Sequence, residues 1–350
     1  MNSIKKNLIL KGKNLLAALK ALNNMSIEDA LTLFVVDENR KIIGTLTDGD
    51  IRRSLINGAS LFDKVENVSY KSFVYIKKTS YKVSDLQLFK AEGRTLIPIL
   101  DDNDIIIDVL NLNTQKSLLP IDAVLMAGGK GVRLRPLTEK TPKPLLPVGG
   151  KPIIDYNVES LINYGIDHIF VTINYLKEQL KDHFKNPINN IKISTISEPK
   201  FLGTIGATQF VPKFYNDVVL VMNSDLFTNI DFEDFYLHFI QNNADISVAA
   251  IPYSISVPYG IFDLDGRKIK GVKEKPVYNY FANAGIYLIK REILENMPKG
   301  IFYNATDLIE DCVKSGKNVI RYPITGYWLD IGNHQEYAKA IELVKHIKRI

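Results

Sequence analysis

The sequence predicts an α/β protein in two parts: a small α+β unit over residues 1–118 and a larger unit with a mainly parallel sheet over residues 121–350. Two observations predict the larger unit. Short apolar runs alternate with helical patterns, and polar or glycine-rich turns separate them. Such strands are typical of parallel sheets that helices cover on both faces. A third observation, a helix–strand–turn–strand order that occurs twice before residue 111, predicts the smaller unit.

Composition and charge narrow the class of protein. The 350 residues are 46% hydrophobic and 24% charged, with a formal net charge of +5. This charge suits anionic substrates, but no concentrated Lys/Arg stripe predicts a nucleic-acid partner. The single cysteine, Cys312, excludes an intrachain disulfide. No apolar run is long enough for a signal peptide or a membrane span, so we expect a cytoplasmic protein without a membrane partner.

The smaller unit is expected to contain two copies of one pattern, a repeat of about 55 residues. Polar turns at 37–40 and 101–104 each separate two strands, and residues 47–50 cap a helix. The expected helices are 15–22, 51–56 and 83–91, and the expected strands are 30–36, 41–46, 95–100 and 105–110. Residues 111–120 are expected to form a linker.

The larger unit is expected to place its chemistry at one edge of the sheet. The expected strands are 122–126, 168–174, 191–196, 218–222 and 246–251, and the expected helices are 154–164, 176–184, 232–242 and 306–315. Ligands of such sheets bind beyond the carboxyl ends of the strands. We therefore expect the site in the loops after Met126, Ile196 and Met222.

A glycine-rich loop follows the first of these strands. It reads Ala-Gly-Gly-Lys-Gly-Val-Arg over residues 127–133. Glycines after a buried strand let backbone N–H groups approach a phosphate, and the basic residues add charge. The spacing of a P-loop is absent, and Leu134 stands where the dinucleotide fingerprint has its third glycine. Downstream, prolines flank Lys143 and stiffen the backbone that holds it.

These motifs resemble those of the sugar nucleotidyltransferase family. The resemblance begins with residues 125–152 and covers about 121–350. It continues, in the family's order, with Glu198-Pro199, 202–207, 223–225, Tyr259-Gly260, 274–276, 283–285 and 328–332. It implies a Rossmann-like nucleotidyltransferase domain. One departure is Val132, where the family commonly has Thr or Ser, so one phosphate contact is in doubt.

The resemblance also implies a reaction and its catalytic residues. A nucleotidyl group passes from a nucleoside triphosphate to a sugar 1-phosphate, and pyrophosphate is released. Arg133 would hold the triphosphate and Lys143 would lie beside the α-phosphate, while Asp225 and Asp330 would hold Mg²⁺. The attacking oxygen belongs to the sugar phosphate, so catalysis is positioning plus charge stabilisation.

Further residues are carried over from the resemblance. The nucleotide-binding set is Leu125, Ala127, Gly128, Gly129, Lys130, Glu198, Gly203 and Thr204. The set for the sugar phosphate is Asn223, Tyr259, Gly260, Glu274, Lys275, Asn283 and Gly285.

The motifs at 202–207, 223–225 and 283–287 look most like those of mannose-1-phosphate and related guanylyltransferases, which favours GTP. A carboxylate at Glu198 would accept hydrogen bonds from the donor edge of guanine. Glucosamine or mannose 1-phosphate is the favoured sugar substrate, and glucose and heptose 1-phosphates remain open. The layout resembles guanylyltransferases that supply cell-surface glycan or nonulosonic acid synthesis in bacteria.

Three alternatives remain open. One is an enzyme of this family that uses UTP or dTTP. Another is a glycosyltransferase, although that class usually has an Asp-x-Asp motif where this chain has Asn223-Ser224-Asp225. The third is a nucleotide-sensing scaffold with an inactive domain. Against it, the chain retains the dispersed charged set of Arg133, Lys143, Asp225 and Asp330.

The smaller unit resembles a pair of CBS modules, on residues 34–37 and 43–51. In that family, residues like Thr47 and Asp50 grip the ribose and phosphate of an adenine nucleotide. The second copy has Asp-Val-Leu-Asn at 108–111 where this motif should lie, so it is expected to have lost its half of the site. A regulatory nucleotide site and a structural or dimerising module both remain open. Since CBS pairs commonly self-associate, the resemblance implies a homo-oligomer.

Overall fold

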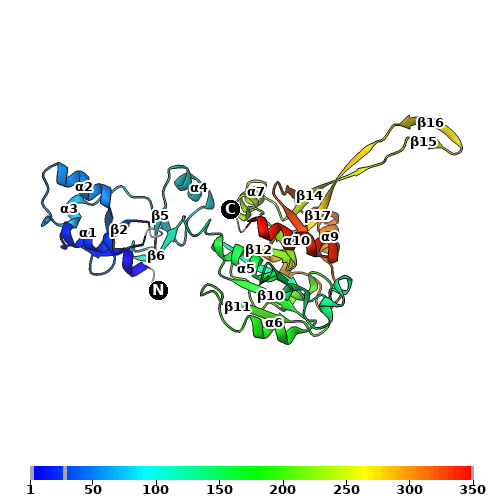
Figure 1. The fold of residues 1–350 in the computed structure, drawn as a ribbon, viewed down its shortest axis with the longest axis horizontal. Coiled ribbons are helices and arrows are strands. Elements are labelled where there is room, and N and C mark those ends of the chain that lie inside the picture. The colour runs from blue at the N-terminus through cyan, green and yellow to red at the C-terminus, as the bar shows by residue number, and fades with distance from the viewer. Residues whose placement is uncertain (1–3, 27–29, 348–350) are drawn as a thin grey trace. The chain divides into compact units, whose positions relative to one another are not determined.

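The computed structural model describes residues 4–26 and 30–347. The chain divides into two compact units, Met1–Leu118 and Leu119–Ile350 (Figure 1). In the part of the chain that the structure describes, no helix is both long and apolar enough to cross a membrane.

The smaller unit contains two three-stranded sheets with the same topology. In each sheet the first two strands are parallel and the third is antiparallel to the second. The first sheet is β1 (Leu8–Leu10), β2 (Thr32–Val36) and β3 (Ile42–Thr47), and the second is β4 (Ile76–Lys77), β5 (Leu96–Leu100) and β6 (Ile106–Asn111). The helices are α1 (Leu15–Asn23), α2 (Asp48–Ile56), α3 (Val65–Val68) and α4 (Val83–Ala91). The predicted order of elements is therefore confirmed in both copies.

Two turns with the same hydrogen-bond pattern show that the halves of this unit are repeats. The Asp37 carboxylate accepts hydrogen bonds from the backbone N–H groups two and four residues later, at 2.9 and 2.8 Å. The Asp101 carboxylate does the same at 2.9 and 2.9 Å. Arg40 and Asp104, the last residue of each turn, both have φ of +63°. The turns lie 64 positions apart, which is more than the repeat size of about 55 residues that the sequence pattern suggested. The segment between the copies, which includes α3, is longer than the sequence pattern suggested.

The two turns also bond to each other. Ile42 N–H donates to the Asp104 carbonyl at 3.3 Å, and Ile106 N–H donates to the Arg40 carbonyl at 3.1 Å. Below them, Phe34 and Leu100 of the central strands share one buried cluster. The halves are thus related by an approximate two-fold operation and share a core.

The larger unit is built on a seven-stranded sheet of order β11-β10-β7-β12-β17-β14-β18 (Figure 1). All neighbouring strands are parallel except β17, which is antiparallel to both β12 and β14. The mainly parallel sheet is therefore confirmed. The strands are β7 (Ile121–Ala127), β10 (Ile169–Ile173), β11 (Ile193–Ser197), β12 (Val218–Asn223), β14 (Ile246–Ser256), β17 (Val277–Lys290) and β18 (Val319–Pro323).

Helices and short strands complete this unit. The helices are α5 (Ile153–Asn163), α6 (Lys177–His183), α7 (Phe232–Gln241), α8 (Arg291–Glu295), α9 (Ala305–Lys314) and α10 (His334–Ile347). Short strand pairs are β8 (Pro147–Val148) with β9 (Lys151–Pro152) and β13 (Leu226–Thr228) with β19 (Trp328–Asp330). Cys312 of α9 is buried in the main core cluster, as its helical pattern predicted.

A two-stranded ribbon leaves the sheet. It consists of the outer parts of β14 and β17 and the hairpin β15 (Ile261–Asp265) and β16 (Lys268–Lys273). Figure 1 shows it projecting far from the body of the larger unit. We call this ribbon, residues 252–281, the arm.

Candidate active site

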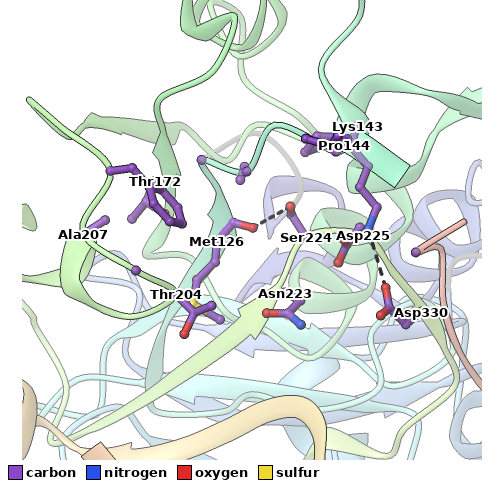
Figure 2. A pocket seen from close by; sticks show the side chains of 18 of the residues that line it. Met126, Lys143, Pro144, Thr172, Thr204, Ala207, Asn223, Ser224, Asp225 and Asp330 are labelled. Carbon is purple, nitrogen blue, oxygen red and sulfur yellow. Dashed lines mark hydrogen bonds and ion pairs between the residues drawn. The ribbon is translucent and has the colours of Figure 1, made fainter. Parts of the chain in front are cut away.

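A pocket of about 430 Å³ lies at the carboxyl ends of β7 and β12, where the sequence placed the chemistry (Figure 2). Its lining residues are Met126, Ala127, Gly128, Gly129, Gly131, Val132, Arg133, Lys143, Pro144, Thr172, Glu198, Phe201, Gly203, Thr204, Ala207, Asn223, Ser224, Asp225, Asp330 and Gly332. Parallel strands that end at one edge explain why segments 200 residues apart meet here.

Two glycines let the glycine-rich loop pass close to neighbouring side chains. Gly131 has φ of +58°, and a Cβ there would lie 2.9 Å from Thr138 Cγ2 and 3.1 Å from Lys143 Cβ. The Thr138 hydroxyl donates to the Gly131 carbonyl at 2.8 Å. At Gly128 a Cβ would lie 2.4 Å from Glu198 Oε1. The loop is therefore held against Lys143 on one side and Glu198 on the other.

Asp225 and Asp330 are brought together by a short strand pair. Leu226 of β13 is opposite Asp330 of β19, and Ile331 N–H donates to the Asp225 carbonyl at 3.2 Å. Behind them, buried Asn157 of α5 uses its Nδ2 to bond the Ser224 carbonyl at 3.2 Å and the Leu226 carbonyl at 3.0 Å. The turn that carries Asp225 is thus fixed from both ends.

Lys143 lies between the two carboxylates (Figure 2). Its ammonium forms an ion pair with Asp225 and lies 3.6 Å from Asp330 Oδ1. The Lys143 residue is only 9% exposed, so the charge is paired rather than solvated. Burial, and then the neighbouring Asp225 carboxylate, raises the pKa of Asp330 above its usual value, although Lys143 and Arg133 oppose the shift. The two aspartates therefore form a concentrated negative site that a cation must neutralise.

Arg133 lies at the same end of the pocket. A Cβ added at Gly332 would be 3.3 Å from Arg133 Nη2 and 3.4 Å from Asp330 Oδ2, so the glycine leaves room for the guanidinium. Arg133 and Lys143 thus present two cations beside the glycine-rich loop.

Glu198 is a buried carboxylate at the opposite wall. It is 4% exposed, and burial raises its pKa. Leu202 N–H donates to its Oε2 at 3.0 Å and partly offsets this shift. The following loop is anchored to α9, because Thr204 N–H donates to Asn304 Oδ1 at 3.2 Å and Thr204 Oγ1 accepts from Ala305 N–H at 2.9 Å.

The pocket brings together most of the residues selected from the sequence. All four catalytic candidates line it, together with Ala127, Gly128, Gly129, Glu198, Gly203, Thr204 and Asn223. Leu125 is fully buried within β7, and the Lys130 side chain is exposed outside the lining.

The candidates for the sugar phosphate are divided. Gly285 lies directly behind Asn223, because a Cβ added at Gly285 would be 2.4 Å from Asn223 Nδ2. The Gly285 N–H donates to Asn283 Oδ1 at 2.9 Å. Gly285 and Asn283, both in β17, therefore support the pocket and do not line it. Tyr259, Gly260, Glu274 and Lys275 are exposed on the arm and do not line the pocket.

Several lining residues had no sequence signal of their own. Thr172 comes from the middle of an apolar strand and Phe201 from an irregular segment after β11. Ser224 lay inside a motif already noted, and its hydroxyl donates to the Met126 carbonyl at 2.7 Å (Figure 2). Asn157, which fixes the Asp225 turn, lies in an amphipathic helix, and nothing in its local sequence indicated a role in the site.

In the smaller unit, Thr47 and Asp50 bond to each other. Thr47 is the N-cap of α2, and its hydroxyl and N–H donate to Asp50 Oδ2 at 2.7 and 2.9 Å. Burial raises the Asp50 pKa, but the bonds from Thr47 and Arg53 outweigh it, so the pKa is lowered. The pair is placed at the start of a helix, where anions are favoured.

Comparison with known proteins identifies the larger unit. The family model described as nucleotidyl transferase matches residues 122–346. The chain belongs to the nucleotidyl transferase family. This nucleotidyltransferase unit has the mixed α/β fold with a mostly parallel sheet that the sequence predicted.

Relatives and solved structures agree with this assignment. A putative mannose-1-phosphate guanyltransferase of Sulfolobus acidocaldarius is 32% identical over 223 residues, 63% of this chain and 62% of that protein. A bifunctional protein GlmU of Methanococcus maripaludis is 32% identical over 61% of this chain and 52% of its own length. The match thus spans between half and two thirds of these curated relatives.

The crystal structure of HddC from Yersinia pseudotuberculosis resembles this chain with a TM-score of 0.51 and 26% identity. It covers 64% of this chain and 99% of HddC. A second structure of HddC, in complex with GMP-PN, gives a TM-score of 0.52 and 25% identity. It covers the same shares of both chains. The expectation of a nucleotidyltransferase is therefore confirmed at the level of the family.

Proposed function

We propose that this nucleotidyltransferase joins a nucleoside triphosphate, GTP by preference, to a sugar 1-phosphate and releases pyrophosphate. The observation that carries the proposal is the convergence of Arg133, Lys143, Asp225 and Asp330 on one pocket beside the glycine-rich loop. A surface that must bring two polyanions together needs backbone N–H donors and cations at one place.

The reaction is a single in-line displacement. A phosphate oxygen of the sugar 1-phosphate forms a bond to the α-phosphorus, while the bond from that phosphorus to the oxygen bridging to the β-phosphate breaks. The electron pair leaves with pyrophosphate. The protein supplies no nucleophile. The loop at Gly128–Gly131 and Arg133 hold the triphosphate, and the Lys143 ammonium balances the charge that develops at the α-phosphate.

The carboxylate pair fits a divalent cation, which this family generally uses. Among residues 4–26 and 30–347, no cluster of three or more His, Cys, Asp or Glu side chains forms a complete ligand set. Two facing carboxylates with a cation already between them suit Mg²⁺, which takes few protein ligands and completes its shell with phosphate and water. Asp225 and Asp330 would hold it, and it would polarise phosphate oxygens when bound. Entry of the ion requires the Lys143 ammonium to leave the pair.

Preference for GTP is argued from Glu198. The described hydrogen bonds give the Glu198 carboxylate one donor, Leu202 N–H at 3.0 Å, so its other oxygen can accept from a ligand. Guanine presents N–H donors on its Watson–Crick edge where uracil and thymine present fewer. The guanyltransferase name of one relative and the GMP-PN complex of HddC support the same base. The printed name of the same relative also supports mannose 1-phosphate as the sugar substrate. The motif resemblance favours glucosamine 1-phosphate equally, and the product would enter cell-surface glycan or nonulosonic acid synthesis.

The test is pyrophosphate release with Mg²⁺ from GTP, UTP, dTTP, CTP and ATP against a panel of sugar 1-phosphates. We expect turnover with GTP and one sugar. Asp225→Ala should abolish turnover, whereas Asp167→Ala, an exposed aspartate outside the pocket, should not. No release with any pair would overturn the reaction and favour the inactive scaffold. Unchanged GTP preference in Glu198→Gln would overturn the role of Glu198 alone.

For the smaller unit we propose a CBS pair whose first half holds one adenine nucleotide at the start of α2. The duplicated turns and the N-terminal position of Thr47 and Asp50 support this. Calorimetric titration of the full chain with AMP, ADP and ATP should give one binding event that Thr47→Val removes. Absence of binding would favour the structural or dimerising module.

A further inference from the structure

The pocket has two ends of different chemistry. Lys143 and the two site aspartates lie at one end, and Thr172 and Ala207 lie at the other (Figure 2). Glu198 lines the wall opposite the lysine and the aspartates. The end that carries the cations suits the phosphates of a nucleotide. The base of the same nucleotide would then lie at the end with Thr172 and Glu198.

Thr172 and Glu198 share one face of the sheet. Thr172 is the polar residue of β10, a strand whose five residues are all buried. The strand register sets it beside Met126 of β7 and Ile196 of β11. Glu198 follows two residues after Ile196, and its N–H extends the ladder by donating to the Ile173 carbonyl at 3.2 Å. Alternate residues of a strand lie on the same face, and both Thr172 and Glu198 line the pocket.

The Thr172 hydroxyl has no hydrogen-bond partner in the part of the chain that the structure describes, although the residue is only 2% exposed. Other buried hydroxyls around the site are bonded. That of Thr138 donates to the Gly131 carbonyl at 2.8 Å, and that of Ser224 donates to the Met126 carbonyl at 2.7 Å. Most buried polar side chains have a partner, so an exception that lines a pocket indicates a contact with a ligand.

We propose that Thr172 selects the base of the nucleotide: its hydroxyl donates to the O6 carbonyl of guanine, and Glu198 accepts from the N–H groups beside that carbonyl. This inference rests on the proposed use of a nucleoside triphosphate. An ionised carboxylate only accepts hydrogen bonds, so Glu198 cannot serve O6. A hydroxyl supplies the donor that this carbonyl needs.

Adenine and uracil fit this pair of side chains less well. The Thr172 hydroxyl can accept from the 6-amino group of adenine, but the Glu198 carboxylate would then face the unprotonated N1 of that base. Uracil offers a carbonyl to Thr172 and one N–H to Glu198, but its second carbonyl would also face the carboxylate. The preference for guanine is therefore assigned to the two residues together.

The test is calorimetric titration of the full chain with GTP and with 6-thio-GTP, with Mg²⁺ and without a sugar phosphate. Because sulfur is a weak acceptor, the wild type should bind 6-thio-GTP about 10-fold more weakly than GTP. Thr172→Val keeps the shape of the side chain and removes the hydroxyl. We expect this variant to bind GTP about 10-fold more weakly than the wild type does, and to bind the two nucleotides alike.

Two further variants are controls. Thr172→Ser retains the hydroxyl and should keep the preference for GTP over 6-thio-GTP. Ser247→Ala removes a buried hydroxyl of β14 that also has no partner but lies outside the pocket lining. It should leave both dissociation constants unchanged.

The outcomes separate this inference from the proposed reaction. A Thr172→Val protein that binds GTP within about 2-fold of the wild type, or that still discriminates against 6-thio-GTP, would overturn the inference. Tighter binding of ATP or UTP than of GTP by the wild type would also overturn it. GTP binding in the expected pattern, without pyrophosphate release for any sugar 1-phosphate, would count against the proposed reaction alone.

Discussion

Asn157 offers the sharpest test of how the site is built. Its side-chain amide is 5% exposed and bonds two carbonyls on either side of Asp225. Asn157→Leu keeps the volume but removes both bonds. Each buried carbonyl left without a partner costs about 1–3 kcal/mol, so we expect the loss of two bonds to lower the free energy of unfolding by about 2–6 kcal/mol.

The same substitution should reduce catalysis beyond its effect on stability. Once the turn at residues 224–226 is no longer fixed, the Asp225 carboxylate loses its position relative to Lys143. Misplacement of a catalytic group by about 1 Å can cost about 100-fold. We therefore expect kcat to fall about 10- to 100-fold in protein that circular dichroism shows to be folded.

Urea denaturation and pyrophosphate release measure the two effects separately. Asn163→Ala, at the exposed end of the same helix, is the control and should change the free energy of unfolding by less than about 0.5 kcal/mol. A loss below about 1 kcal/mol for Asn157→Leu, or an unchanged kcat, would refute the reasoning that these two bonds hold the aspartate.

Three further predictions follow from single contacts. Asp225→Asn should lower kcat at least about 100-fold with folding intact, and residual activity above a tenth in the pyrophosphate assay would contradict its role. Because burial raises the pKa of Glu198, its ionised form is penalised as pH rises past its ordinary value near 4.5. Denaturation from pH 4 to 8 should therefore show Glu198→Gln gaining stability over the wild type with rising pH, and a constant difference would contradict this. Gly203→Ala should lose at least about 3 kcal/mol, since φ is +83° and the new Cβ would lie 2.5 Å from the Tyr303 carbonyl oxygen. Gly300→Ala, with φ of +74° and open space, should lose only about 1 kcal/mol on thermal or chemical denaturation.

The buried strands were predictable because their composition leaves few alternatives. The run Val218–Met222 is wholly apolar and is bounded by polar residues, and it forms β12 with one residue more. β7 and β10 follow the same pattern with one polar residue each, Asp122 and Thr172, and their positions fixed the edge at which the site was expected. Apolar runs of about five to seven residues are typical of strands in a sheet that helices cover on both faces.

The arm was not predicted, because its strands lack that composition. β16 alternates lysines with apolar residues, and β17 has Asn283 and Gly285 in its middle, so neither resembles a buried strand. The Asp-Gly pair at 265–266 is a hairpin signal that would have located the tip. Of the residues placed near the sugar phosphate from their motifs, Asn223 lines the pocket, and the others lie on this arm or behind the pocket. Motif order carries no information about where a ribbon points.

The pocket itself was only partly predictable. Charged residues next to glycines and strand ends, such as Arg133 and Asp225, stand out in a sequence. The supporting contacts do not, because Asn157 meets residues 67 and 69 positions away through the fold. No local pattern distinguishes it from any other polar residue on an amphipathic helix.

The duplicated unit has one consequence for stoichiometry. Its two turns and two sheets repeat closely, but the repeat stops after the third strand. β3 leads into α2 through a capped start, whereas no helix follows β6 within residues 112–118. A helix N-terminus directly after the third strand, that of α2, is therefore present in the first half and has no counterpart in the second. A ligand that depends on that terminus binds at one equivalent per chain, and the second half serves as the counterpart that closes the core.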